Sequence, residues 1–103
     1  MSYIGKNPKV DSVKLDGSAT VPTGAAVEGQ VYFNTGTAVT VTLPSAVTNA
    51  AIIFKDSAGT AATNNITINR ADSATIDGAT SQTISSNYGS MKLISDGTNW
   101  FIT

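Results

Sequence analysis

The side chains that perform most acid–base, nucleophilic and metal-binding chemistry are scarce in this sequence. Its 103 residues include no histidine and no cysteine. This composition excludes the Ser-His-Asp and Cys-His arrangements of nucleophilic catalysis, and it leaves no Cys or His to hold a structural zinc ion. General acid–base catalysis near neutral pH loses its commonest residue as well, because that residue is histidine.

Carboxylates remain as candidates for catalysis, since a pair of them can hydrolyse a glycosidic bond. Three of the seven acidic residues, Asp16, Asp77 and Asp96, precede glycine and are explained as turn residues. No stretch has the spacing of an EF-hand calcium loop, and no Gly-rich phosphate-binding pattern occurs. We therefore predict a protein that is not an enzyme and that has no catalytic residue, no metal site and no cofactor.

Charge and hydropathy also restrict the partners that the chain is expected to bind. The net charge is −1, and of the six basic residues only Lys6, Lys9 and Lys14 lie close together. Nucleic-acid binding usually needs a basic face, so we expect no such partner. No apolar run approaches the roughly 20 residues that cross a bilayer, and the first residues lack the apolar region of a secretory signal. We expect no membrane partner either.

The elements that would position any site are short β-strands. Stretches with a period of two alternate with turn residues such as Asp77-Gly78 and Asn87-Tyr88-Gly89. Strands are predicted at 30–34, 38–43, 50–55, 66–69, 82–85, 91–94 and 100–102, with one more at 13–15. Residues 90–95 and 100–103 flank a short loop with glycine, which predicts a β-hairpin. No segment has a convincing helical period.

Two of these strands carry further information about burial. In strand 38–43 the valines and Leu43 lie on one face and the threonines on the other, which predicts one buried and one open face. Pro44 ends this strand because proline donates no hydrogen bond to a ladder. Strand 50–55 is the most apolar, and we expect it to be covered on both faces.

Short strands at regular spacing predict an all-β fold, a small antiparallel sandwich or jelly-roll-like knob over residues 28–103. Only 7% of the residues are aromatic. A core of this kind is thin against the entropy of ordering about 100 residues, so we predict that the chain forms an oligomer. Short strands rich in Thr, Ser and Asn suit an intertwined or side-by-side trimer in which three chains share an axial core. The residues assigned to the trimer and core are Ile66, Ile68, Ile76, Ile84, Leu93, Trp100 and Ile102.

Residues 1–27 are rich in Gly, Pro, Ser and Lys and carry isolated apolar residues. One interpretation is a disordered tail, and the other is an extended N-terminal arm that becomes ordered on a partner. We favour the arm. Its predicted docking residues are Tyr3, Ile4, Lys6, Pro8, Lys9, Val10 and Leu15. The lysines near the N-terminus would either face an acidic protein surface or remain in solvent.

Aromatic residues suggest a second kind of surface, because aromatic rings stack on sugars. The residues in question are Tyr32, Phe33, Phe54, Trp100 and Phe101. The alternative is that at least three of the five are core residues, since they lie in predicted strands with apolar neighbours. A surface glycan is therefore a minor candidate partner.

Several short motifs resemble a β module found in structural proteins of tailed bacteriophages. They are ITINR at 66–70, ATIDGA at 74–79, QTI at 82–84, NYGS at 87–90 and LISDGTNW at 93–100, with TVTLP at 40–44 and IIFKDSAG at 52–59 upstream. The opening SYIGKNP at 2–8 is similar to the segment by which many such proteins attach to the particle. The resemblance implies a homotrimer in the virion that is not catalytic.

Length helps to choose among phage appendages. A tail fibre needs a shaft, whereas here an arm leads directly into one small domain. We therefore expect a capsid decoration, or cement, protein that is made in the host cytoplasm. It would bind the major capsid protein on the outer capsid surface as a homotrimer and stabilise the shell. The alternative is a short tail-fibre or adaptor module that binds a host-surface glycan.

Overall fold

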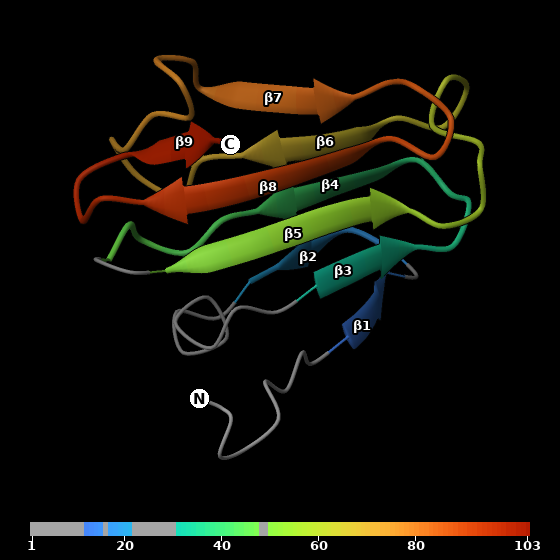
Figure 1. Cartoon of the computed structure of the whole chain (residues 1–103), viewed down its shortest axis with the longest axis horizontal. Helices are drawn as coiled ribbons and strands as arrows, with labels where there is room; N and C mark the ends of the chain where they lie inside the picture. The colour runs from blue at the N-terminus through green and yellow to red at the C-terminus, as the bar shows by residue number, and fades with distance from the viewer. Residues whose placement is uncertain (1–11, 16, 22–30, 48–49) are drawn as a thin grey trace.

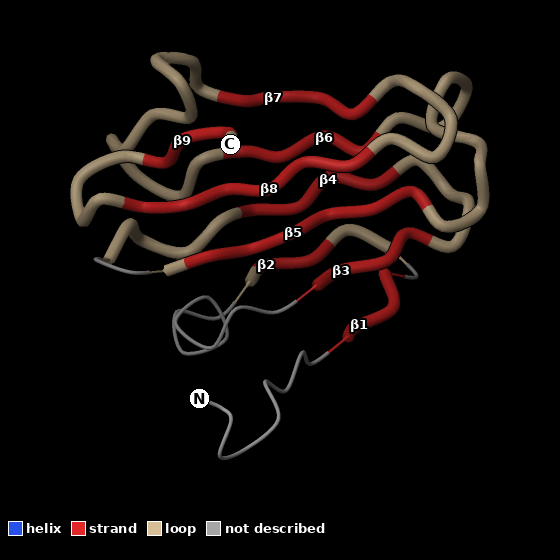
Figure 2. Tube along the Cα trace, in the orientation of Figure 1, coloured by secondary structure: helices blue, strands red, loops and turns tan. Residues whose placement is uncertain are grey.

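The chain folds into nine short strands and no helix within the part described here, residues 12–15, 17–21, 31–47 and 50–103 of a computed structural model (Figure 2). The strands are β1 (Ser12–Leu15), β2 (Ala19–Thr20), β3 (Val31–Asn34), β4 (Val39–Thr42), β5 (Ala51–Asp56), β6 (Ile66–Asn69), β7 (Ser81–Ile84), β8 (Ser90–Ser95) and β9 (Trp100–Ile102). The all-β prediction is confirmed, and the predicted strands are found within a residue or two.

The strands form two sheets that face each other. Sheet A has five strands in the order β1-β3-β5-β8-β9, and sheet B has four in the order β2-β4-β6-β7. In Figure 1 sheet A lies in front of sheet B, with β1 at the bottom and β7 at the top. The two inner faces enclose the apolar side chains, as in a sandwich.

The first six strands pair in parallel, which differs from the antiparallel arrangement that we expected. The chain crosses from one sheet to the other after each of the first five strands, so β3 joins β1 and β5 joins β3 in sheet A, while β4 joins β2 and β6 joins β4 in sheet B. Parallel neighbours need a crossover connection, and here a strand of the opposite sheet supplies it. The chain thus winds as a coil between the two sheets.

The last three strands are antiparallel and close one end of the coil. The predicted hairpin is confirmed, since β8 pairs with β9 across the turn at Asp96–Asn99. The side of β9 that does not pair with β8 makes two other backbone hydrogen bonds. The N–H of Trp100 donates to the carbonyl of Thr75 at 2.8 Å, and the N–H of Asp77 donates to the carbonyl of Trp100 at 3.0 Å. The segment between β6 and β7 therefore caps this edge of sheet A.

The core lies between the sheets and follows the strand alternation. Tyr32 and Phe54 are register partners whose rings stack with centroids 5.5 Å apart. Val39, Val41 and Leu43 are buried from the other side, as the alternating pattern predicts. The largest fully buried side chain belongs to Trp100, beside the cap. One chain thus encloses a continuous apolar interior of its own.

Two stretches that we assigned to the N-terminal arm are part of this sandwich. Strands β1 and β2 pair with β3 and β4, and Leu15 and Val21 are buried in the core at 3% and 2% exposure. Their apolar side chains are isolated in the sequence, and only the parallel pairing with strands much later in the chain gives them neighbours. An arm on this fold would end before Ser12.

Candidate interaction surfaces

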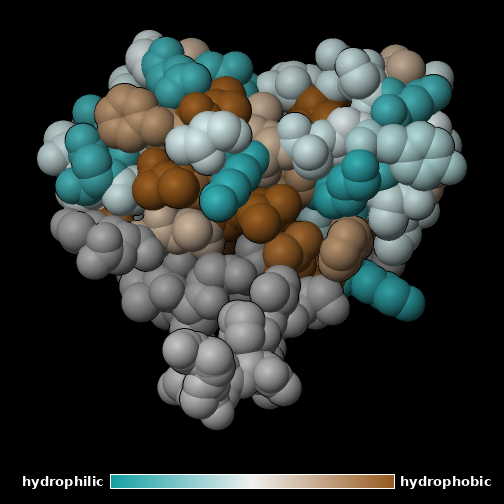
Figure 3. All heavy atoms as spheres, viewed as in Figure 1, coloured by the Kyte–Doolittle hydropathy of each residue, from teal (hydrophilic) through white to brown (hydrophobic). Residues whose placement is uncertain are grey.

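The outer face of sheet A carries partly exposed apolar side chains from four neighbouring strands. They are Val31, Phe33, Ala51, Ile53, Ile94 and Phe101. Strand register places Val31 beside Ile53, and it places Ile94 between Ala51 and Phe101. Ile94 and Phe101 are 37% and 41% exposed. Figure 3 shows several brown patches in the middle of this view, with teal and pale side chains between them.

Three lysines lie within the same face. Lys14 and Lys55 flank Phe33 in one row of the sheet, and Lys92 lies opposite Ile53 in the next. Lys55 and Lys92 are diagonal neighbours across β5 and β8, a separation of about 7–8 Å in an antiparallel pair. None of the three forms an ion pair with a described residue, although the Lys55 ammonium donates to the backbone carbonyl of Tyr88. We call these nine residues the Lys-apolar face.

The outer face of sheet B has a different composition. Its strand residues are Thr20, Thr40, Thr42, Thr67, Asn69, Ser81 and Thr83. All are polar and uncharged, and their side chains can hydrogen-bond to water. This face needs no covering partner.

A buried carboxylate organises the loops where β5 ends. Asp56 is fully buried and accepts four backbone hydrogen bonds at 2.8–3.2 Å. One oxygen, Oδ1, accepts from Ala58 and Gly59, and the other, Oδ2, accepts from Ala61 and Tyr88. Asp56 therefore joins the loop after β5 to the turn before β8.

The protonation of Asp56 follows from the same contacts. Burial by itself raises the pKa of the carboxyl, but the four N–H donors favour the charged form and outweigh it, so the pKa lies below its ordinary value. All of these bonds are internal, which leaves the carboxylate occupied by the fold. Asp56 thus has a structural role in this arrangement.

Two features fix the exposed turn beside Asp56. Tyr88 has a φ of 60° and is 61% exposed, while its ring lies over Gly59. A Cβ added at Gly59, whose φ is +77°, would stand 2.5 Å from the Tyr88 ring. Gly59 is therefore required both for its backbone conformation and for the space under the ring.

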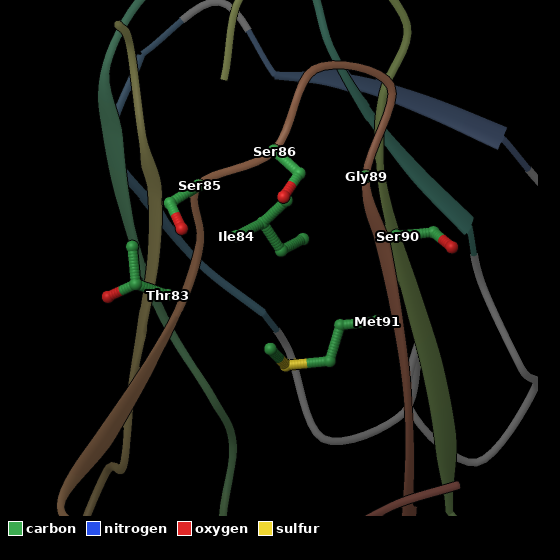
Figure 4. Close-up of a pocket in the computed structure, with 7 residues that line it drawn as sticks. All are labelled: Thr83, Ile84, Ser85, Ser86, Gly89, Ser90 and Met91. Atoms are coloured by element: carbon green, nitrogen blue, oxygen red, sulfur yellow. The ribbon is translucent and has the colours of Figure 1, made fainter. Parts of the chain in front are cut away.

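A shallow hollow of about 200 Å³ lies between β7 and the start of β8 (Figure 4). Its lining consists of Thr83, Ile84, Ser85, Ser86, Gly89, Ser90 and Met91. Hydroxyl groups surround two apolar side chains, and no charged group or aromatic ring lines it. The hollow therefore offers nothing that would fix the orientation of a ligand beyond single hydroxyl contacts.

The predicted site residues fall into three groups. Tyr3, Ile4, Lys6, Pro8, Lys9 and Val10 lie outside the described residues. Leu15 is buried in the core. Of the residues assigned to a trimer and core, Ile66, Ile68, Ile76, Ile84, Leu93 and Trp100 are buried within the single chain, and Ile102 is 36% exposed. Side chains that are already buried in one chain have no surface left to offer a second.

The five aromatic residues considered for sugar binding separate in the same way. Tyr32, Phe54 and Trp100 are core residues, whereas Phe33 and Phe101 lie on the Lys-apolar face. No motif in the sequence indicates this face. One feature pointed to it: strand 50–55 is apolar on both faces, and we expected both to be covered. The structure covers Ile52 and Phe54 and leaves Ile53 partly exposed.

Comparison with known proteins adds no family. No protein-family model matches the chain, and no curated protein matches it significantly. Among the described residues no group of three acidic, His or Cys side chains is placed to hold a metal ion. The described part also contains no helix long and apolar enough to cross a membrane.

Proposed function

We propose that this chain is a non-catalytic structural protein of a tailed-bacteriophage particle, and that it decorates the outer capsid surface as a homotrimer and stabilises the shell. The observation that carries the proposal is the Lys-apolar face, a sheet surface whose apolar side chains stay partly exposed among the described residues. Such a surface suits a protein that binds another protein. The choice of a phage particle rests on motifs that resemble phage appendage modules, at residues 66–70, 74–79, 87–90 and 93–100.

The mechanism is attachment by several weak contacts. Each chain would offer the residues before Ser12 to the shell as one point of attachment. Three chains in one trimer would attach together, because the first contact raises the effective concentration of the other two. A decoration that bridges neighbouring capsid subunits stabilises the shell, since it binds the assembled state and not the separated subunits.

The test uses shells of the phage that encodes this chain, prepared with and without it. Shells that lack the chain should release their DNA at a lower temperature, and addition of purified chain should restore the original temperature. Unchanged release temperatures combined with lost adsorption to host cells would refute the decoration function. Sedimentation at micromolar concentration tests the trimer, and a single-subunit species on the shell as well as in solution would contradict it.

A second candidate is a short tail-fibre or adaptor module that binds a host-surface glycan. The observation in its favour is the exposure of two aromatic rings, Tyr88 at 61% and Phe101 at 41%. The test is a glycan array with the purified chain. Specific binding that is lost in Tyr88→Ala or Phe101→Ala would favour this function, and an array without binding would count against it.

A further inference from the structure

We propose that the Lys-apolar face is the docking surface of the folded domain, and that its partner is a protein surface on which carboxylates border apolar side chains. The inference rests on the proposed function to the extent that this partner is the phage shell. It adds the face that binds, the chemistry that it recognises and a contact that is separate from the N-terminal arm.

The apolar character of this face is the first argument. A sheet face open to water normally alternates polar residues outward, as sheet B does. In β5 the outward residues are Ala51, Ile53 and Lys55, and two of these three are apolar. A strand that is apolar on both sides is typical of a sheet covered on both sides. The covering layer for sheet A is absent from the described part of the chain.

Lysine side chains alone do not cover this surface. The stems of Lys14 and Lys55 can lie over Phe33, which they flank. At the other end of the face, Ala51, Ile94 and Phe101 form a row that contains no lysine. Ile94 and Phe101 remain more than a third exposed. This row is the apolar centre that a partner would bury.

Charge decides which kind of partner fits. The strand residues of the face include three lysines and no carboxylate. A second copy docked symmetrically by the same face would bring lysine against lysine, which costs free energy in a desolvated contact. Lys55 and Lys92 are already close to each other within one chain. Carboxylates on a different protein would relieve this repulsion and pair with both.

The size of the face indicates how strongly it binds. The five strands are four, four, six, six and three residues long. At about 3.3 Å per residue and about 4.8 Å between strands, they cover roughly 360 Å². Stable protein–protein complexes bury about 800 Å² on each partner. One face is therefore a weak site, and several faces must act together. This agrees with a multivalent decoration, in which each chain adds one contact.

The test compares two variant proteins of equal net charge. One is altered on the outer face of sheet A, and the other is altered on the outer face of sheet B. The double substitution Lys55→Gln with Lys92→Gln removes two positive charges from sheet A. The control, Thr40→Glu with Thr83→Glu, adds two negative charges to the exposed residues of sheet B, so both proteins have the same net charge. Circular dichroism and thermal unfolding establish that each variant is folded. Binding to shells that lack the chain is then measured by co-sedimentation at increasing protein concentration.

We expect the sheet A variant to bind about tenfold more weakly than the unmodified chain, and the control to bind normally. A second sheet A variant, Ile94→Thr with Phe101→Thr, should show a similar loss without any change in charge. Equal binding by all four proteins would overturn the docking face and leave the proposed function standing. Failure of the unmodified chain to bind shells would refute the proposed function, and with it the partner named here.

Zero-length carbodiimide cross-linking of assembled particles identifies the partner. This reagent joins a lysine amine to a carboxylate that touches it. Cross-links from Lys55 or Lys92 to acidic peptides of a shell protein are expected. Cross-links from the same lysines to acidic peptides of this chain would show that the chain itself or a second copy of it covers the face, and either result would overturn the proposal. Cross-links confined to Lys6 and Lys9 would assign binding to the N-terminal segment instead.

Discussion

The outer faces of the two sheets are both formed by short strands, but they expose different kinds of side chain. Sheet B presents threonine, asparagine and serine, whereas sheet A presents aliphatic and aromatic side chains among three lysines and Ser90. Both sheets supply the same buried core from their inner sides. Burial in the core therefore explains the apolar residues of the two inner faces. Contact with water explains the polar residues on the outer face of sheet B. Among the described residues, neither folding nor contact with water accounts for the apolar side chains on the outer face of sheet A.

The largest expected effect separates the inner and outer sides of sheet A. Phe54 and Ile53 are adjacent in β5, but Phe54 is fully buried and Ile53 is partly exposed. Phe54→Ala should lower the free energy of unfolding by about 3–5 kcal/mol, and Ile53→Thr should lower it by less than about 1 kcal/mol. Urea denaturation measures both. A large loss for Ile53→Thr would mean that the outer face is needed for folding.

A second comparison concerns one carboxylate beside each sheet. Asp56 is the last residue of sheet A strand β5 and is fully buried, whereas Asp72 follows sheet B strand β6 and is exposed. Asp56→Asn replaces an acceptor of four N–H bonds and should cost about 2–3 kcal/mol. Asp72→Asn should lower the stability much less than Asp56→Asn, because water can replace the hydrogen bonds of the Asp72 carboxylate to Ala74 and Ser45. Thermal unfolding at pH 7 distinguishes the two.

Acid should reveal the same difference. The pKa of Asp56 is lower in the folded chain than its ordinary value of 3.8, so its contribution to stability is complete above that pH. The contribution is lost as the pH falls through the folded pKa. The unmodified chain should therefore lose stability on acidification below about pH 4, and Asp56→Asn should lose less. Parallel curves for the two proteins would contradict the role assigned to Asp56.

A smaller effect is expected at the turn beside sheet A. Gly59→Ala places a methyl group against the Tyr88 ring at a positive φ, and we expect a loss of about 1–2 kcal/mol. Gly17→Ala is the control, because nothing lies within 4 Å of a Cβ there. Thermal unfolding of both variants measures the difference. Equal stability would show that the Tyr88 ring moves aside at no cost.

The smallest effect should come from exchanging the characters of the outer faces. Thr40→Ile with Thr67→Ile makes a register pair on sheet B apolar, and Ile94→Thr with Phe101→Thr makes one on sheet A polar. Each should change the free energy of unfolding by less than about 1 kcal/mol. Shell binding should be unchanged in the first and weakened in the second. A gain of binding by the first variant would show that apolar surface alone is recognised.

Local features of this fold could be predicted from the sequence, and long-range ones could not. The alternation of Val39, Thr40 and Val41 specifies a strand and its buried side, because side chains on a strand alternate. The turn residues Asp96 and Gly97 specify the final hairpin in the same local way. A period of two is equally compatible with parallel and antiparallel neighbours, so the coil between two sheets was not predicted. Leu15 was misplaced for that reason.

The candidate site was harder to predict than the fold. Phe33 and Ile53 look like core residues in the sequence, and only strand register shows that they point outward beside Lys55. Asp56 follows an apolar strand and precedes Ser57 and Gly59, as an ordinary loop residue would. Its burial depends on Tyr88, which lies far along the chain. The sequence around Asp56 does not indicate this burial, and neither does the sequence around Tyr88.

The winding path of the first six strands has a consequence for how such a chain can change over generations. One complete circuit, such as the path from Val31 to its partner Ile53, adds one strand to each layer. Duplication of a circuit would lengthen the stack by one step and leave the pairing of every other strand intact. Descendants of this architecture can therefore grow taller in equal increments at constant cross-section.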